Sequence, residues 1–584
     1  MDLKRIIILI PLAILAYLLV VQWNQDYHQP APEPQAPTLT ANSSDATQPS
    51  DVLDAPESTS ERATSPLENG QSANPAQENA SNSLVSVDTD VLDLRIDPRG
   101  GDIIYAALPE QQQALNSETP FVLLSDSTSR SYIARSGLQL ENHPGRIIFS
   151  PEQTDYRLAD GERQLVVELN ANVDGIAVTK RYTFERGSYA VKIDYLVNNQ
   201  SAEPATARFI GQLARDQSAD PTTTGGMGMK SYLGAAFSSP DSRYEKVSFD
   251  DIRNGRFANR DVQGGWVAVI QHYFVSAWVP NPNQSNLFYG DVDAASRTVA
   301  AFAGPSMQVA AGSQGDFGAT LYIGPKIQSQ LAATAPNLEL TVDYGWLWFL
   351  AAPLFWLLSK IHGLVGNWGW SIVLLTCVVK AVLLPLSAKA YKSMARMRKM
   401  GPEMQRIKEL HGDDRQKMSQ EMMKFYQKEK INPLGGCLPM LVQMPVFIAL
   451  YWMLMESVEL RHAPFMLWIQ DLSAMDPYFI LPILMGLSMF VQQQLNPTPP
   501  DPTQAKIMKM LPIIFTFFFL WFPAGLVLYW ITNNVLSIAQ QYMITKQIEK
   551  ADEKREAQKK AEQAAEHQKK LERQKQKEQN VEGK

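Results

Sequence analysis

Five apolar segments in the last two fifths of the 584-residue chain constrain its fold more than any other feature. Each carries at most one charged side chain. A bilayer interior about 30 Å thick is crossed by a helix of about 20 apolar residues. We therefore predict five transmembrane helices, at 368–386, 438–455, 477–494, 507–521 and 525–543. The last two are short, so we expect a thinned bilayer or wetted helix ends there.

A sixth span is predicted at the N-terminus. The apolar run 6–21 follows Lys4 and Arg5, and no A-x-A cleavage site comes after it. With its flanking residues the run is long enough to cross the membrane, so we interpret 1–23 as an uncleaved transmembrane anchor. The basic start places the N-terminus in the cytoplasm.

The segment 344–366 is apolar but shorter than a span. Its run WLWFLAAPLFWLL, at 346–358, is only 13 residues long, and Ser359, Lys360 and His362 follow it. A run of this length, rich in tryptophan, is typical of an amphipathic helix at the membrane surface. We therefore predict an interfacial helix, whose tryptophans at headgroup depth are Trp346, Trp348 and Trp356.

Charge separates along the chain as it would across a membrane. Residues 24–345 hold 22 basic and 39 acidic side chains, 387–431 hold 12 and 6, and 546–584 hold 12 and 9. Cytoplasmic loops of membrane proteins carry the excess of Lys and Arg. Six spans therefore place 24–345 and the hairpin 457–475 outside. Both basic segments and both chain termini are then cytoplasmic.

The polar region divides into a linker and a folded domain. Residues 24–85 are rich in Pro, Ala, Ser, Thr, Asn, Gln and Glu, and we predict a disordered linker because they cannot bury enough apolar surface. From 86 to 343, short runs such as IAVTKRYTF (176–184) and YAVKIDYLV (189–197) alternate with turn residues. This pattern predicts a large all-β sandwich. The domain has no cysteine, which excludes a disulfide framework there.

The basic segment 387–431 predicts two antiparallel helices, because it is mostly helix-forming and HGDD at 411–414 interrupts it. The hinge is expected near Gly412. Methionines spaced along this hairpin either pack between its two helices or make adaptable contacts to varied hydrophobic segments. They are Met394, Met397, Met400, Met404, Met418, Met422 and Met423.

Two long runs in the apolar part resemble a known family. They are NPLGGCLPMLVQMPVFIALYWMLMESVELRHAPFMLWIQDLSAMDPYFILPILMG (432–486) and KIMKMLPIIFTFFFLWFPAGLVLYW (506–530). They are similar to the YidC/Oxa family of membrane insertases, and the resemblance covers about 344–545. It implies a five-helix core, 367–545, around a hydrophilic groove that opens to the cytoplasm. The anchor and the outer domain resemble the Gram-negative members, in which that domain is periplasmic.

The function that the resemblance implies is insertion and folding of proteins in the bacterial inner membrane, alone or with the Sec translocon. The implied partners are nascent membrane proteins, the translocon and membrane lipids. The tail 546–584 alternates Lys and Arg with Glu, which is typical of a solvated charged helix. Its excess of base also suits ribosomal RNA or anionic lipid. The resemblance favours contact with the ribosome.

Lys380 is the strongest single candidate for a functional residue in the predicted spans. A basic residue inside a spanning helix costs about 2.5–3.5 kcal/mol on insertion scales. One interpretation is snorkelling, because Lys380 lies six residues before Leu386, about 9 Å from the cytoplasmic end of the span. The other follows from the resemblance, which implies that a single basic residue here lines the groove and attracts acidic, hydrated segments. Many members carry arginine at this position, so the charge is kept without the bidentate geometry.

Other polar and aromatic residues inside the predicted spans are further groove candidates. Thr376 lies one turn before Lys380 on the same face, where its hydroxyl can also bond to its own helix. The remaining polar candidates either line the groove or join helices. Tyr529 and Trp530 either contact the substrate segment, as the resemblance implies, or serve packing. The polar candidates of the later spans are Gln443, Thr532 and Asn533.

The sequence offers no enzymatic site, and we expect no cofactor. GGMGMK (225–230) lacks the ending of a phosphate-binding loop, and the seven histidines are not paired at metal-ligand spacing. Two alternatives stay open. One is an assembly scaffold that the membrane part only anchors. The other is a secondary transporter, which would predict paired intramembrane acids or inverted repeats, neither of which is visible.

Overall fold

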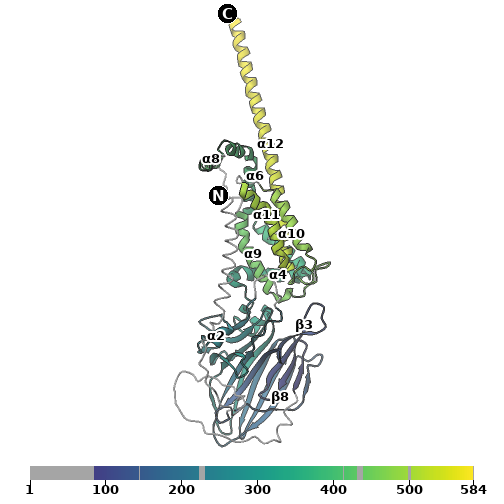
Figure 1. Ribbon diagram of the computed structural model, residues 1–584, viewed down its shortest axis with the longest axis vertical. Helices are drawn as coiled ribbons and strands as arrows, with labels where there is room; N and C mark the ends of the chain where they lie inside the picture. The colour runs from purple at the N-terminus through teal and green to yellow at the C-terminus, as the bar shows by residue number, and fades with distance from the viewer. Residues whose placement is uncertain are drawn as a thin grey trace, which may run out of the picture.

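The chain forms a β-sandwich joined end to end with a bundle of helices, from which one long helix continues (Figure 1). The computed structural model describes residues 84–143, 145–222, 231–411, 414–429, 438–496 and 502–582. The predicted anchor 1–23 lies outside the described residues, as does the linker up to residue 83. The first strand already begins at Val85.

The β-rich part consists of two sheets, whose paired neighbours are antiparallel except for β1 and β7. The 11-stranded sheet has the order β14 (Arg260–Gln263), β17 (Ser285–Val292), β18 (Thr298–Ala303), β11 (Ala205–Arg215), β5 (Arg130–Leu140), β4 (Pro120–Ser127), β3 (Asp102–Gln112), β2 (Asp93–Asp97), β1 (Val85–Asp88) and β7 (Asp155–Arg157), with β19 (Met307–Val309) paired to β11. The 9-stranded sheet has the order β13 (Glu245–Val247), β12 (Gly234–Ser238), β15 (Trp266–Ile270), β16 (Phe274–Pro280), β20 (Gln314–Pro325), β10 (Ala190–Asn199), β9 (Ile176–Glu185), β8 (Gln164–Val173) and β6 (Ser150–Pro151).

Alternating side chains bury the two sheets against each other. Along β9 every second residue is buried, as the alternation in the sequence predicts. Across the core, the Phe209 ring of β11 lies 5.8 Å from the Trp278 ring of β16 and 5.6 Å from Phe302 of β18, measured between centroids. Because β11 and β16 belong to different sheets, this aromatic cluster joins the two layers. The short helices α2 (Phe249–Arg253) and α3 (Gln328–Thr334) lie outside the sheets.

The C-terminal part is helical. Its first three helices are α4 (Trp348–Val365), α5 (Trp368–Val382) and α6 (Leu384–Lys399). Two helices, α7 (Gly401–His411) and α8 (Arg415–Lys428), follow, and then α9 (Leu438–Glu456), α10 (Ile480–Gln494) and α11 (Pro502–Phe518). The last helix, α12, runs from Ala524 to Glu582 without a break, so the predicted fifth span and the basic tail are one helix of 59 residues (Figure 1). Short 3-10 helices lie at Leu338–Thr341, Gly345–Leu347, Val458–Leu460 and Phe519–Trp521.

The first predicted core span is shorter than the apolar run suggested. Helix α5 ends at Val382, and α6 leaves it at an angle of 68°. Pro385 lies in the first turn of α6, where a backbone N–H would have no hydrogen-bond partner within the helix, so proline is tolerated there. The segment 387–431 therefore contains most of α6 in addition to the paired helices α7 and α8. The prediction of only two helices there is wrong, because Met400 and Gly401 end α6 well before the HGDD interruption.

The segment predicted as an interfacial helix is longer than its apolar run. A helix of 21 residues, Gly345–Val365, continues through Lys360 and His362 until Gly366 ends it at φ 71°. Its length and its apolar composition are those of a membrane span. Among the described helices, only this one and the bent pair α5–α6 reach that length and composition. The interfacial placement and the count of six spans therefore stay predictions.

The β-sandwich contacts the end of α9 and the loop that follows it through polar groups, some of them buried. The Lys326 Nζ, directly after β20, lies 2.8 Å from the Glu456 Oε2 at the end of α9, and the two side chains are 1% and 2% exposed. The His272 Nε2 lies 2.9 Å from the Met455 carbonyl oxygen. Arg461 donates to the Gln112 carbonyl oxygen at 2.7 Å. The β-domain is therefore fixed to α9 by a completely buried ion pair and flanking hydrogen bonds.

Candidate functional site

Lys380 points into the helical bundle. Helix α5 begins at an Asn367 cap, whose side chain accepts from the Trp370 N–H, and Lys380 is its only charged residue. The Lys380 Nζ donates to the Ser537 Oγ of α12 at 2.7 Å. The side chain is partly buried. This geometry differs from snorkelling, in which the amine would leave the bundle for the cytoplasmic surface.

The part of α12 that faces Lys380 is polar along one side. Ser537 is 2% exposed, and its neighbours on this helix face are buried amides. The Asn534 Nδ2 donates to the Ser488 Oγ of α10 at 2.9 Å. The Gln541 Nε2 donates to the Leu495 carbonyl oxygen at 3.0 Å. Buried polar groups in a spanning helix are costly unless they are paired or meet water, so this stripe indicates a polar interior. The buried amides of the stripe are Asn533, Asn534, Gln540 and Gln541.

Two of the threonine candidates bond to their own helices. The Thr376 Oγ1 donates to the Ile372 carbonyl oxygen at 2.7 Å, and the side chain is 1% exposed. The Thr532 Oγ1 donates to the Leu528 carbonyl oxygen at 2.8 Å. Both follow the pattern of a hydroxyl that satisfies itself four residues back. Among the described residues, neither threonine has a hydrogen bond to Lys380.

Gln443 and Tyr529 are brought together across two helices. The Gln443 Nε2 of α9 donates to the Tyr529 hydroxyl of α12, and Tyr529 is 1% exposed. The pair joins the bundle, which is one of the two roles the sequence leaves open. Asn533 is 9% exposed, and its Oδ1 has no hydrogen-bond partner among the described residues.

Trp530 lies in an aromatic cluster. Its ring centroid is 4.6 Å from that of Phe447 in a perpendicular arrangement and 5.2 Å from that of Phe519. Phe515 lies 6.1 Å away. These contacts join α9, α11 and α12, so Trp530 packs the bundle, which the sequence left as one of two interpretations.

The methionines of α6, α7 and α8 do not share one environment. Met394, Met404 and Met422 are buried at 7–8% exposure. The Tyr426 hydroxyl contacts the Met404 sulfur at 3.7 Å, which links α7 to α8. Met423 is 53% exposed. Neighbouring methionines therefore differ in role: Met422 is buried in packing contacts, whereas Met423 is exposed at the surface. The partly buried members are Met397, Met400 and Met418.

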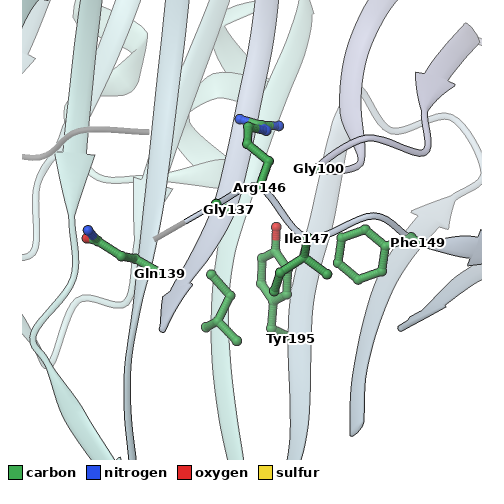
Figure 2. Close-up of a pocket in the computed structure, with 9 residues that line it drawn as sticks. Gly100, Gly137, Gln139, Arg146, Ile147, Phe149 and Tyr195 are labelled. Atoms are coloured by element: carbon green, nitrogen blue, oxygen red, sulfur yellow. The ribbon is translucent and has the colours of Figure 1, made fainter. Parts of the chain in front are cut away.

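The β-domain has a separate pocket in which Arg146 and Tyr195 are prominent (Figure 2). The Arg146 Nη2 lies 2.5 Å from the Asp102 Oδ1, so its charge is paired within the protein. Beside it, Lys180 is fully buried, and its Nζ donates to the Gly100 and Gly101 carbonyl oxygens at 2.9 and 2.8 Å. Burial lowers the pKa of Lys180 well below its usual range. The local hydrogen bonds give this cluster a structural role in joining β9 to the turn before β3.

Comparison with known proteins covers both parts of the chain. Residues 84–357 match the family described as the YidC periplasmic domain, and 360–553 match the family described as 60Kd inner membrane protein. The membrane protein insertase YidC of Stutzerimonas stutzeri (strain A1501) is 55% identical over 557 residues, 94% of this chain and 99% of the relative. The chain belongs to the YidC insertase family.

Further relatives in the YidC family are of similar length. The membrane protein insertase YidC of Pseudomonas fluorescens (strain SBW25) is 52% identical over 567 residues, 95% of this chain and all of the relative. A solved structure described as an active YidC insertase with its first transmembrane domain resolved has a TM-score of 0.37 and 18% identity, over 79% of this chain and 93% of that one. The predicted resemblance and the combination of a periplasmic β-rich region with a helical C-terminal part are confirmed.

Ser537 is the site residue that the sequence-based prediction missed. It lies in the run LVLYWITNNVLSIAQQYM, seven residues after Trp530 and four after Asn533. That spacing places Ser537 on the same helix face as the predicted candidates. The signal was therefore present, but a serine inside an apolar helix most often bonds to its own backbone and is easily passed over.

Proposed function

We propose that this chain is a membrane protein insertase of the bacterial inner membrane, which moves hydrophobic segments of nascent proteins into the bilayer through a cytoplasm-open hydrophilic groove. The observation that carries the proposal is the direction of Lys380. The only charge of α5 bonds to α12 inside the bundle. The buried polar stripe of α12 supports a groove between these helices. The YidC relatives of nearly equal length carry the name of this activity.

Lys380 acts on the polar flank of the substrate. The residues 524–545 of α12 and all of α10 contain no acidic side chain, so the ammonium has no internal counter-charge there. An acidic, hydrated flank of a substrate supplies that counter-charge when it enters the groove. Because the flank keeps polar partners on its way, it avoids the full cost of entering hydrocarbon.

The apolar part of the substrate leaves along α10 and α12. These neighbouring helices present exposed apolar side chains, among them Leu487, Phe490 and Val535. Transfer of apolar surface out of water supplies about 25 cal/mol per Å². The membrane potential adds to this when an acidic flank moves outward. No nucleotide is needed for such a step.

The cytoplasmic helices and the tail receive the substrate. Exposed Met423 offers an adaptable apolar contact on α8. Residues 553–570 of α12 are exposed throughout and carry six basic and four acidic side chains, an excess of base that suits the ribosome or anionic lipid. We also propose the Sec translocon as a partner, because the same groove can receive segments released by it. Six spans with cytoplasmic termini complete this topology.

Insertion into liposomes that contain only the purified chain tests the proposal. The substrate is a small single-span protein with an acidic flank, scored by protease protection. Wild type should protect it, and Lys380→Ala should reduce protection about tenfold, because the acidic flank loses its charge-assisted hydrogen bond to the ammonium. A substrate with a neutral flank is the matched control and should respond much less.

Three outcomes separate the alternatives. Equal protection by wild type and Lys380→Ala would keep the insertase but remove Lys380 from its working parts. No protection by either folded protein would favour an assembly scaffold that needs the translocon. Equal losses with acidic and neutral flanks would show that the variant is damaged in general.

A further inference from the structure

Ser537 has a hydrogen-bonding arrangement that only a donor can complete. Its hydroxyl donates to the Asn533 carbonyl oxygen four residues earlier at 2.6 Å. The single hydroxyl proton is therefore committed to the α12 backbone. The oxygen keeps lone pairs for a donor, and the Lys380 Nζ occupies that position at 2.7 Å. An ammonium group has three N–H donors and no acceptor, so the two groups are complementary.

The ammonium has one hydrogen-bond acceptor inside the bundle, although the buried Asn533 Oδ1, on the same face of α12, has no partner among the described residues. Among the described residues, Ser537 is the one side chain that accepts a hydrogen bond from Lys380. Thr376, one turn earlier on α5, also donates its hydroxyl proton to its own backbone, but no hydrogen bond joins it to Lys380 among the described residues. Without an internal acceptor, a lysine this close to the end of its helix would extend along its stem to the cytoplasmic surface.

Ser537 also lies where three helices meet. It is 2% exposed on α12, it receives Lys380 of α5, and α6 packs against α12. Because α6 leaves α5 at 68°, this position is beside the bend rather than in a straight stretch of the bundle. The Ser537 hydroxyl is therefore fixed by its bond to the Asn533 carbonyl oxygen, and it defines one position for the Lys380 amine.

We infer that Ser537 is a positioning residue that holds the Lys380 ammonium inside the bundle, where it meets the acidic flank of a substrate. The inference rests on the proposed insertase function for its consequence, but the position of the amine can be measured independently of activity. The hydroxyl acts through Lys380 and does not itself need to touch the substrate.

The test compares Ser537→Thr with Ser537→Val in the full-length protein in liposomes. The two side chains have nearly the same shape, and only threonine keeps the hydroxyl. Lys380 is acylated with a membrane-impermeant sulfosuccinimidyl ester and quantified by peptide mass spectrometry, relative to Lys424, whose side chain is 69% exposed. We expect labelling of Lys380 to be roughly threefold faster in the valine variant, as for loss of one interhelical hydrogen bond. The control is Ser371→Ala, which removes a buried hydroxyl of α5 that does not bond to Lys380. In this variant Lys380 should be labelled at the wild-type rate.

Insertion of the acidic-flank substrate is measured on the same preparations. The threonine variant should retain insertion and the valine variant should lose it roughly threefold, with a smaller change for the neutral flank. Equal Lys380 labelling in the valine and threonine variants would overturn the inference, and so would equal insertion by these two variants when Lys380→Ala is impaired. If Lys380→Ala inserts normally, the proposed role of Lys380 fails, whereas the labelling contrast still decides whether Ser537 holds the amine.

Discussion

At the residue scale, single polar groups decide where this chain departs from its hydrophobic pattern. Along β9 the buried alternation includes Lys180, where an apolar residue is expected. Its partners come from Gly100, Gly101 and Ser136, far away in the sequence. Periodicity predicts which face of a strand is buried, but it cannot predict a distant carbonyl group that makes a buried lysine tolerable. The same limit applied to Ser537, whose importance depends on a lysine 157 positions away.

Lys380 could be proposed from the sequence because an isolated charge in an apolar helix has few explanations. Its direction could not, since a lysine stem reaches either the groove or the surface. The structure favours the bundle through one hydrogen bond to α12. Thr376 and Thr532 donate their hydroxyl protons to their own backbones, and neither has a hydrogen bond to Lys380 among the described residues. Residue type and spacing therefore predicted the neighbourhood of the site, and only the helix packing assigned the contacts.

Glu459 gives a pH prediction. It lies in the 3-10 helix Val458–Leu460, in the hairpin 457–475 outside the predicted spans, and burial raises the pKa of its carboxyl to about 7. The folded state therefore holds a proton that the unfolded state releases near pH 4.5. Stability contributed by this proton is complete below that pH and is lost as the pH rises to about 7.

We expect the melting temperature of wild type to fall relative to Glu459→Gln between pH 4.5 and 8, by a few degrees. Thermal unfolding of both proteins in the same detergent across this range measures the difference. The glutamine variant keeps the shape and removes the titration. Parallel curves for the two proteins would contradict the raised pKa.

At the element scale, helices α4, α5 and α6 show why boundaries were harder to predict than elements. The apolar run 368–386 continues past the end of α5 because α6 also begins with apolar residues. The hydropathy of the run gives no sign of the bend between α5 and α6. Pro385 does indicate it, because proline favours the first turn of a new helix. Likewise the apolar run of α4 ended at 358, but the helix continued because Lys360 and His362 are compatible with helix.

The adjacent methionines of α8 give a prediction at this scale. Met422 is 7% exposed and Met423 is 53% exposed. Met422→Ala should destabilise the α7–α8 pair by about 2–3 kcal/mol because it leaves a cavity. Met423→Ala should leave stability within about 0.5 kcal/mol of wild type and lower contact with substrate.

Limited proteolysis of helices α7 and α8 measures the first effect. Photo-crosslinking from position 424 to a stalled nascent chain measures the second. A result in which both variants lose stability equally would contradict the assignment of one methionine to packing and the other to the surface.

At the scale of the whole molecule, the β-domain and the helices are not independent bodies. The Lys326–Glu456 pair is buried between them at 1% and 2% exposure. Buried ion pairs contribute little compared with apolar replacements, but removing one partner leaves an uncompensated charge. The sequence contained both residues, 130 positions apart, and no local pattern connects them. Long-range pairing of this kind is the part of the architecture that the sequence does not predict.

Lys326→Met should lower stability by about 3–5 kcal/mol, because Glu456 stays buried without its partner. The double variant Lys326→Met with Glu456→Leu should recover most of this loss. Thermal unfolding in detergent, followed separately in the β-domain and the helices, provides the measurement. If the single and double variants unfold alike, the two side chains do not compensate each other in the folded protein.

Helix α12 has a mechanical consequence. Its 59 residues extend about 88 Å at 1.5 Å per residue, from the apolar bundle to the far end of the tail (Figure 1). Lys399 of α6 braces this rod near its exit from the bundle, 3.1 Å from Asp552. A continuous helix fixes the distance between its two ends, so it acts as a spacer between the bundle and the tip of the tail. A partner bound at the tip of the helix is therefore held at a set distance from Ser537.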